Sequence, residues 1–155
     1  MRPMNGILNI RKEPGWTSHD VVAKLRRILG QKRIGHTGTL DPDAEGVLPV
    51  CLGKATRAAD MLTDQTKTYE AVLLLGVETD TQDAGGKILD RREVVCTPEE
   101  LSECVHSFLG EQLQIPPMYS ALKKDGKKLY ELAREGKTVE REPRKVRFYE
   151  ITLLE

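Results

Sequence analysis

The sequence has no excess of charge of either sign, which argues against a general role in binding polyanions. Its 24 basic residues balance its 24 acidic residues, whereas non-specific affinity for nucleic acid comes from an excess of Lys and Arg. The distribution is less even than the total. Residues 24–33 hold five cations and no acid, residues 123–128 hold four cations around one Asp, and acids concentrate in 78–103. Each basic run, taken alone, indicates a solvated surface.

The sequence also lacks long apolar runs. None approaches the roughly 20 residues that a membrane-spanning helix needs. The first 15 residues do not contain the apolar core of a secretory signal. We therefore expect a cytoplasmic protein with no membrane partner. Its 155 residues, 39% of them hydrophobic, fit one domain with a genuine core.

Cysteine is scarce. Cys51, Cys96 and Cys104 are odd in number, far apart and not arranged as a C-x-x-C pair. We predict buried, unreactive thiols, because free Cys is among the most buried residue types and each one lies in an apolar or helical context. A structural zinc site needs clustered thiolates or imidazoles and is not expected.

The pattern of apolar and turn residues predicts an α+β domain, because strands and helices alternate unevenly. Strands are expected at residues 6–12, 47–53, 67–77, 87–95 and 145–155, and helices at 17–30, 54–64, 97–110 and in a short segment ending at Gly136. The run 67–77 is the clearest strand, since it is long, apolar and followed by a polar, turn-rich loop.

Two of the helices carry clear terminal signals. Thr17 with Asp20, and Thr97 with Glu100, have the spacing of capping boxes, and Gly30 is a typical helix stop. The expected apolar faces are Val21, Val22, Leu25, Ile28 and Leu29 in the first helix, and Leu101, Cys104, Val105, Phe108 and Leu109 in the second.

The most unusual stretch is RIGHTGTLDPDAEGVLPV, residues 33–50. Its acids fit the opening of an EF-hand loop, but the twelfth position is Leu52 instead of a bidentate Glu, so a calcium site is excluded. A phosphotransfer aspartate would follow an apolar strand, and GHTGTL precedes Asp41 instead. Composition alone favours a structural turn.

One local feature favours a functional carboxylate over a plain turn. Pro42 pushes Asp41 out of the helical region into an extended conformation. Gly35 and Gly38 allow another backbone to approach closely. Together they would present the Asp41 carboxylate at a defined place in a cleft.

Four segments in order resemble the bacterial tRNA pseudouridine synthase B family. They are KEPGWTS, GHTGTLDPDAEGVLPVCLGKATR, KTYEAVLLLGVETDTQDAGG and QIPPMYSALKKDGKKLYELAREG. The resemblance implies a pseudouridine synthase fold with a mixed, largely antiparallel sheet and flanking helices, incomplete in this chain. It implies isomerisation of a uridine in the T-loop of tRNA, at position 55, to pseudouridine. We expect a monomer that acts on the T-stem-loop without cofactor or metal.

The resemblance also assigns roles to residues of this chain. Asp41 would be the covalent nucleophile, attacking uracil or the ribose C1′ of a flipped-out nucleotide. Such a carboxylate must be ionised, so it needs a cationic partner that holds its pKa down. Tyr69, His36, Lys12 and Lys123 would bind substrate: Tyr69 by stacking on uracil and His36 by replacing unstacked bases.

The resemblance also concerns residues 114–140, Glu13 and two features of the family that residues 1–155 do not contain. Residues 114–140 resemble its RNA-gripping insertion, whose lysines would meet phosphates. Glu13 stands where the family has proline, which affects the local turn. The family's later arginine motif and C-terminal RNA-binding domain do not occur in residues 1–155, and the strand expected at 145–155 has no following neighbour. We therefore expect the N-terminal portion of the catalytic domain.

Two other functions remain open from the sequence. The first is a non-catalytic module for RNA binding or RNA folding that keeps the base-flipping loop. The second is a metal-dependent phosphotransferase that uses Asp41 and Asp43.

Overall fold

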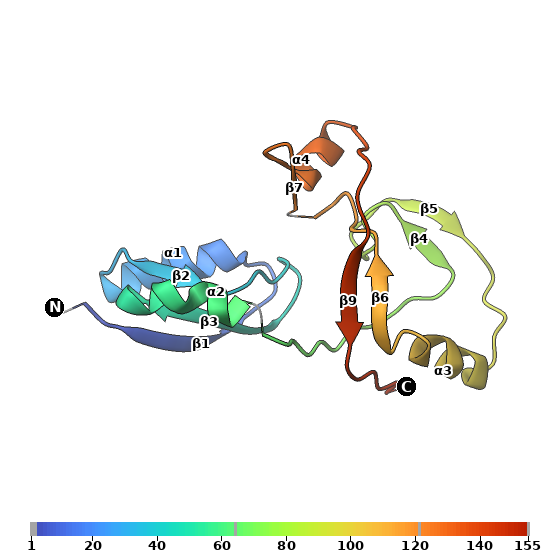
Figure 1. Ribbon diagram of the computed structural model, residues 1–155, viewed down its shortest axis with the longest axis horizontal. Helices are drawn as coiled ribbons and strands as arrows, with labels where there is room; N and C mark the ends of the chain where they lie inside the picture. Colours follow the sequence, from blue (N-terminus) through green and yellow to red (C-terminus); the bar gives the residue numbers. More distant parts are fainter. Residues whose placement is uncertain (1–2, 64, 121, 155) are drawn as a thin grey trace. The chain divides into compact units, whose positions relative to one another are not determined.

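The computed structural model describes residues 3–63, 65–120 and 122–154. Its internal contacts divide the chain into two units, residues 1–70 and residues 71–155. In Figure 1 the first unit runs in colour from blue to green and the second from green through yellow to red. Each unit has its own sheets and helices and is described by itself.

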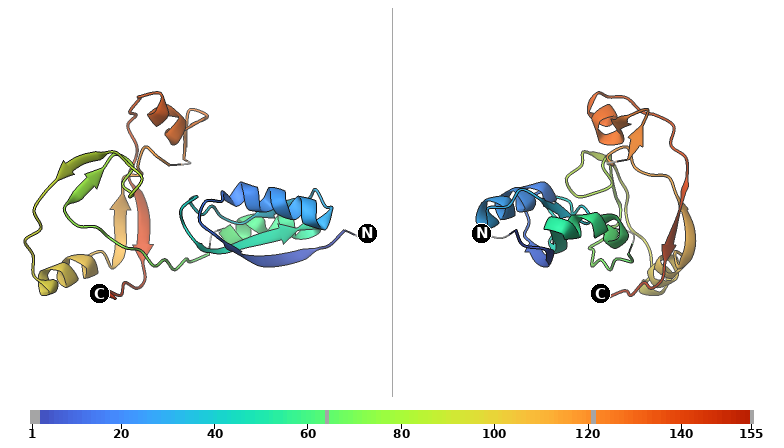
Figure 2. Two further views of the ribbon diagram at one scale, coloured as in Figure 1. Left: turned by 180° about the vertical axis from the view of Figure 1, so that it is seen from behind. Right: turned by 60° about the vertical axis from the view of Figure 1, so that its left-hand side comes forward.

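The first unit is a three-stranded antiparallel sheet packed against one long helix (Figure 2). Its elements in chain order are β1 (Gly6–Lys12), α1 (Ser18–Leu29), β2 (Ile34–His36), β3 (Gly46–Leu52), the 3₁₀ helix η1 (Gly53–Ala58) and α2 (Ala59–Thr63). The strand order is β1-β3-β2, so β3 is central. The predicted strands at 6–12 and 47–53 and the helix at 17–30 are confirmed to within one residue at each end.

Helix α1 begins and ends where the sequence predicts. Asp20 N–H donates to Thr17 Oγ1 at 3.1 Å, and Thr17 N–H donates back to Asp20 Oδ2 at 3.0 Å, which completes a capping box. The Thr17 hydroxyl and then its backbone N–H stabilise the ionised carboxylate and lower the pKa of Asp20. At the other end Gly30 has φ 58°, a left-handed conformation that glycine adopts without strain.

The core of this unit lies between α1 and the sheet. Its buried members are Val21, Val22, Ile34, Leu48, Val50 and Leu52, and Leu25 and Leu29 pack against them. Ile28 is 64% exposed, so its predicted place in the core is wrong. Leu29, the next residue, packs against the core, so Ile28 lies at the margin of the apolar stripe.

The second unit contains small, separate sheets. Its elements are β4 (Val77–Thr79), β5 (Ile88–Arg91), α3 (Pro98–His106), β6 (Gly110–Gln114), β7 (Lys123–Lys124), β8 (Lys127–Lys128), α4 (Leu129–Arg134) and β9 (Arg144–Phe148). The strands pair antiparallel as β4-β5, β6-β9 and β7-β8. The α+β class is confirmed. The expected single mixed sheet differs from what is found, because every pairing in the described residues is antiparallel and the strands fall into four sheets.

The predicted strand at 67–77 is wrong: β4 begins only at Val77. The residues before it run without strand pairing, and Val72 is fully exposed while Leu73 and Leu74 are more than 70% exposed. A continuous apolar run is typical of a strand inside a sheet whose two faces are both covered. Such a strand needs neighbouring strands with which to pair. The described residues supply none to this segment.

Other elements of the second unit are shorter than predicted. The strands expected at 87–95 and 145–155 are limited to β5 and β9, whose single neighbours are β4 and β6. Helix α3 has the predicted capping box, in which Glu100 N–H donates to Thr97 Oγ1 at 3.2 Å. It ends at His106, and none of its residues is buried, so its predicted core face is wrong.

The cysteines divide between the two units. Cys51 is buried in β3 as predicted, and this burial raises the pKa of its thiol. Cys96 and Cys104 are exposed, so the prediction of burial is wrong for both. Cys104 lies in α3, a helix in which no residue is buried.

Within residues 3–63, 65–120 and 122–154, we find no helix with the length and apolarity required to span a membrane.

Candidate active site

The candidate site is the loop between β2 and β3, which carries Asp41. Strand pairing fixes both ends of the loop, with Ile34 opposite Leu52 and His36 opposite Val50. Asp41 itself is exposed. Its carbonyl oxygen accepts a hydrogen bond from Ala44 N–H at 3.1 Å, which closes a turn over Pro42 and Asp43.

A buried lysine is hydrogen-bonded to the loop at the residue after Asp41. The Lys12 side chain at the end of β1 is completely buried, and its Nζ donates to the carbonyl oxygens of Trp16 at 2.8 Å, Pro42 at 3.0 Å and Glu13 at 3.1 Å. Gly15 N–H also donates to Pro42 O, at 2.9 Å. The ammonium group of lysine has three donors, and here all three are used by the backbone.

A buried serine holds the loop on the other side of Asp41. Leu40 N–H donates to Ser18 Oγ at 3.0 Å, and Ser18 Oγ donates to Leu40 O at 3.3 Å. Ser18 is 2% exposed and is the first residue of α1. The segment 12–18 therefore contacts the residues that directly precede and follow Asp41.

The Asp41 side chain has a different environment from its backbone. In the part of the chain that the structure describes, no group donates a hydrogen bond to its carboxylate and no cation pairs with it. The cationic partner expected for a nucleophilic carboxylate is thus not supplied by these residues. The carboxylate is presented to solvent on a fixed backbone.

His36 and Thr37 form the entrance to the loop. His36 lies in β2, is partly buried, and its buried Nδ1 atom has no hydrogen-bond partner among the described residues. Thr37 is 4% exposed. Its N–H donates to Pro49 O at 3.1 Å, and its carbonyl accepts from Thr63 Oγ1 of α2 at 2.6 Å. Helix α2 thus fixes the backbone next to His36.

An ion pair closes the far end of the loop. Arg11 Nε lies 2.6 Å from Glu45 Oε1, and a second guanidinium nitrogen contacts the same oxygen. Both side chains are largely exposed, so we expect the pair to contribute at most about 1 kcal/mol. It joins β1 to the residue before β3.

Tyr69 and Lys123 are not brought to Asp41 by any described contact. Tyr69 lies in the segment that precedes β4, is 71% exposed, and has no hydrogen bond or ring contact within the described ranges. Lys123 lies in the second unit, in β7. Of the predicted site residues, the structure therefore joins Lys12 to the Asp41 loop through Pro42, and His36 through the chain itself.

The lysines of the second unit form a hairpin. Strands β7 and β8 place Lys123 opposite Lys128, and Lys124 opposite Lys127. The turn Asp125-Gly126 has φ 52° and 84°, as expected for the type I′ turn that Asp-Gly favours. Like charges in cross-strand positions repel, so this hairpin is suited to an anionic partner.

A short helix supports this hairpin. Leu129 and Leu132 of α4 are buried, and Leu129 N–H donates to Leu122 O at 2.7 Å. At the end of the helix, Lys137 and Lys127 lower the pKa of Glu135. The segment 114–140 thus contains a folded hairpin-helix motif within the second unit.

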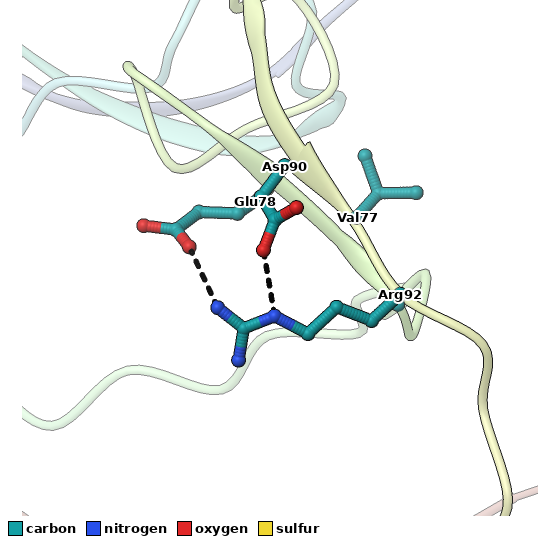
Figure 3. Close-up of a pocket in the computed structure, with 5 residues that line it drawn as sticks. Val77, Glu78, Asp90 and Arg92 are labelled. Carbon is teal, nitrogen blue, oxygen red and sulfur yellow. Dashed lines mark hydrogen bonds and ion pairs between the residues drawn. The ribbon is translucent and has the colours of Figure 1, made fainter.

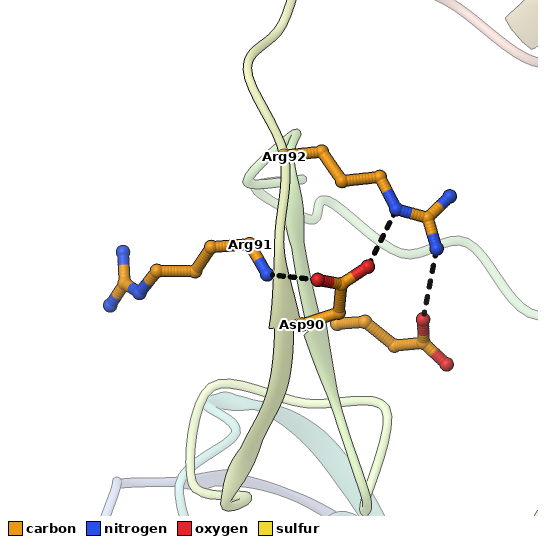
Figure 4. Close-up of polar contacts among 4 residues, drawn as sticks. Asp90, Arg91 and Arg92 are labelled. Atoms are coloured by element: carbon orange, nitrogen blue, oxygen red, sulfur yellow. Dashed lines mark hydrogen bonds and ion pairs between the residues drawn. The ribbon is translucent and has the colours of Figure 1, made fainter.

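Two surface pockets are lined by residues of the second unit. One is lined by the β4-β5 hairpin (Figure 3). There Arg92 Nε lies 2.6 Å from Asp90 Oδ2, and another nitrogen lies 4.0 Å from Glu78 Oε2. Arg91 N–H donates to the second Asp90 oxygen at 2.8 Å (Figure 4). Since the Arg92 side chain is 74% exposed, this cluster is a solvated surface of the hairpin.

Metal-binding geometry does not occur in the described residues. No group of three or more His, Cys, Asp or Glu side chains in residues 3–63, 65–120 and 122–154 could hold an ion.

Sequence reasoning missed part of the hydrogen-bonding frame of the loop. Ser18, Gly15 and Thr37 were not assigned a role. Ser18 and Thr37 are polar residues of a kind that is usually exposed, and only their burial in the fold distinguishes them. The sequence carries no local signal of the contact between Ser18 and Leu40, which are 22 residues apart.

The structure thus presents an exposed carboxylate, within an α+β fold, on a backbone that is hydrogen-bonded on both sides of Asp41. Comparison with known families makes this more specific. The chain belongs to the TruB family of pseudouridylate synthases, because the model of that family's N-terminal domain matches residues 26–155.

Individual proteins agree with this assignment. The chain is 58% identical over 152 residues to tRNA pseudouridine synthase B of Alkaliphilus oremlandii, covering 98% of this chain and 51% of that protein. It is 51% identical over 153 residues to tRNA pseudouridine synthase B of Ralstonia pickettii, covering 99% and 48%. The chain thus spans about half the length of the curated relatives it matches.

A solved structure is similar in fold. A chain in the crystal structure of a Cbf5-Nop10-Gar1 complex superposes with a TM-score of 0.62 at 29% sequence identity. The match covers 97% of this chain and 35% of that chain. The recognition of the family from four sequence segments is confirmed by these comparisons.

Proposed function

We propose that this chain is the N-terminal part of an enzyme that isomerises a uridine in the T-loop of tRNA, at position 55, to pseudouridine. The observation that carries the proposal is the geometry at Asp41: an exposed carboxylate whose flanking backbone is hydrogen-bonded to buried residues of the segment 12–18. The family match and the name shared by the relatives support the same reaction class.

The reaction needs a nucleophile and no external group. The Asp41 carboxylate adds to the uracil ring or to the ribose C1′, and the bond between N1 and C1′ breaks. The detached uracil turns, C5 bonds to C1′, and the bond between the Asp41 oxygen and the uracil ring or C1′ breaks, which frees the carboxylate. The proton on C5 is then lost while N1 gains one, so substrate and product have the same composition.

The target nucleotide must leave its base stack to reach an exposed loop residue. We assign Tyr69 to stacking on the extruded uracil, because its ring is exposed and adjacent to unpaired backbone. We assign His36 to the space left in the RNA. Its backbone is fixed through Thr37, whose carbonyl oxygen accepts from Thr63 Oγ1, and its ring is only partly buried.

The geometry of Lys12 favours a supporting role over direct substrate contact. Its Nζ is buried and donates to three carbonyl oxygens, one of them of Pro42. A phosphate could bind this group only if those bonds broke. We assign Lys12 to holding the Asp41 loop.

The lysine hairpin is proposed to contact RNA phosphates. Replacing Lys123 with alanine should weaken tRNA binding about two- to fivefold and reduce the slope of log K against log salt by about 0.7–1, the loss of one phosphate contact. Filter binding at several salt concentrations measures both. Lys87→Ala is the matched control, because Lys87 is also exposed in the second unit but lies outside the hairpin. Equal salt slopes for the two variants would contradict the assignment.

The proposed activity is tested with a chimera. Residues 1–155 replace the matching 152 residues of the Alkaliphilus oremlandii relative, whose remaining half supplies the segment that this chain lacks. The chimera is incubated with tRNA carrying tritium at uracil C5. Release of tritium is expected from the chimera, because C5 must lose its hydrogen when it bonds to the sugar.

The outcomes separate the proposal from its alternatives. Binding of tRNA without tritium release would indicate an RNA-binding or RNA-folding module. Release that depended on added magnesium would point to metal chemistry at Asp41 and Asp43. Neither result is expected.

A further inference from the structure

Ser18 is a buried polar residue that is hydrogen-bonded to Leu40, the residue before Asp41. It has no part in the proposed chemistry. Its hydroxyl accepts from Leu40 N–H at 3.0 Å and donates to Leu40 O at 3.3 Å. Both backbone groups of the residue before Asp41 are thus bound by one side chain. The arrangement is like that of a hydrogen-bonded pair in an antiparallel sheet, with a hydroxyl in place of the partner strand.

Ser18 is itself held in place by the start of α1. Thr17 is the N-cap and forms the capping box with Asp20, so the backbone of Ser18 is fixed as the first helical residue. Its side chain is 2% exposed, which shields both hydrogen bonds from competition by water. The position of Leu40 therefore follows from the position of the helix.

The backbone around Asp41 has three further constraints. Asp41 O accepts from Ala44 N–H, and Pro42 O accepts from Gly15 N–H and from Lys12 Nζ. These act at or after Asp41. The Leu40 side chain packs against the core, and among the described residues the hydrogen bonds to the Leu40 backbone come from Ser18. Without Ser18, the chain could turn about Leu40 and displace the Asp41 carboxylate.

We propose that Ser18 is a positioning residue for Asp41: its two hydrogen bonds to Leu40 set the direction in which the Asp41 carboxylate points. The proposal rests on the proposed function, since it concerns the reactivity of that carboxylate. It does not give Ser18 any contact with RNA.

The first test measures the loop directly in the 155-residue chain. In Ser18→Ala, amide hydrogen exchange of Leu40 and Ala44 followed by NMR should be at least about tenfold faster relative to the amides of β3, because the bond at Leu40 is lost and the turn at Asp41 loosens. Thr17→Ala is the matched control. It weakens the same helix but removes neither hydrogen-bonding group of the Ser18–Leu40 contact, so the ratio should rise much less than in Ser18→Ala.

The second test measures reaction kinetics in the chimera. Ser18→Ala should lower kcat about 10- to 100-fold, because a small displacement of a reacting group is costly. KM should stay within about threefold, because RNA-contacting residues are untouched. Thr17→Ala should keep kcat within about twofold when both variants are assayed below their melting transitions. Ser18→Cys keeps the size of the side chain with weaker hydrogen bonding and should give an intermediate kcat; it replaces Ser18→Ala if that variant does not fold.

The results distinguish the two proposals. Unchanged exchange at Leu40 in Ser18→Ala, or an equal fall in kcat in Ser18→Ala and Thr17→Ala, would overturn the role of Ser18. A chimera without substitutions that releases no tritium would count against the proposed function alone, because the exchange experiment contains no RNA.

Discussion

Replacing Asp41 with asparagine is expected to lower tritium release from tRNA on the order of 10³-fold or more, the loss typical when a covalent nucleophile is removed. The amide has the shape of the carboxylate but cannot form the covalent bond. Because Asp41 is exposed and no described group bonds to its carboxylate, the free energy of unfolding should change by less than about 0.5 kcal/mol. The dissociation constant for tRNA should stay within about threefold.

The neighbouring acid provides the control for this prediction. Asp43 is exposed on the same turn, two residues further along, and Asp43→Asn makes the same change of charge. It should release tritium at close to the normal rate. Normal release by Asp41→Asn, or an equal loss in both variants, would show that Asp41 is not the nucleophile.

The second large effect is expected on stability. Lys12→Met should lower the free energy of unfolding of the first unit by about 3 kcal/mol, because the carbonyl oxygens of Glu13 and Trp16 lose the buried ammonium donor and each unpaired group costs about 1–3 kcal/mol before the methionine packs in its place. Pro42 O keeps the hydrogen bond from Gly15 N–H. Since a domain of this kind has only about 5–15 kcal/mol in total, the loss should be visible as a large shift in a urea unfolding curve.

Lys67 offers a control of the same chemistry at the surface. Its Nζ donates to Thr63 O at 2.7 Å and to Gln65 O at 2.9 Å, but the residue is exposed. Water can replace the ammonium group there, so Lys67→Met should cost less than about 0.5 kcal/mol. If the two variants unfolded at the same urea concentration, burial of Lys12 would not have the importance assigned to it.

The parts of the fold that could be predicted from sequence are those set by nearby residues. The capping boxes at Thr17 and Thr97 and the left-handed Gly30 form where their spacing indicates, since each depends on a few consecutive residues. The strand expected at 67–77 fails for the opposite reason. Its apolar pattern predicts that its side chains are buried in a sheet, but a strand forms only beside a partner strand, and the described residues provide none for this segment.

The same distinction holds for the site. Asp41 could be singled out from Pro42 and the neighbouring glycines, and it lies on an exposed turn. The burial of Lys12 could not be predicted, because one of its acceptors, Pro42 O, lies 30 residues away in the sequence. Lysine is usually a surface residue. Lys12 is a buried hydrogen-bond donor because the loop that carries Pro42 lies beside the end of β1.

The exposed segment 71–74 has a consequence for handling the isolated chain. Val72, Leu73 and Leu74 combine unpaired backbone N–H and C=O groups with exposed apolar side chains, and no proline or charge interrupts residues 71–75. Such a segment is a template on which copies can stack edge to edge into cross-β aggregates. Self-association through this segment would rise with concentration.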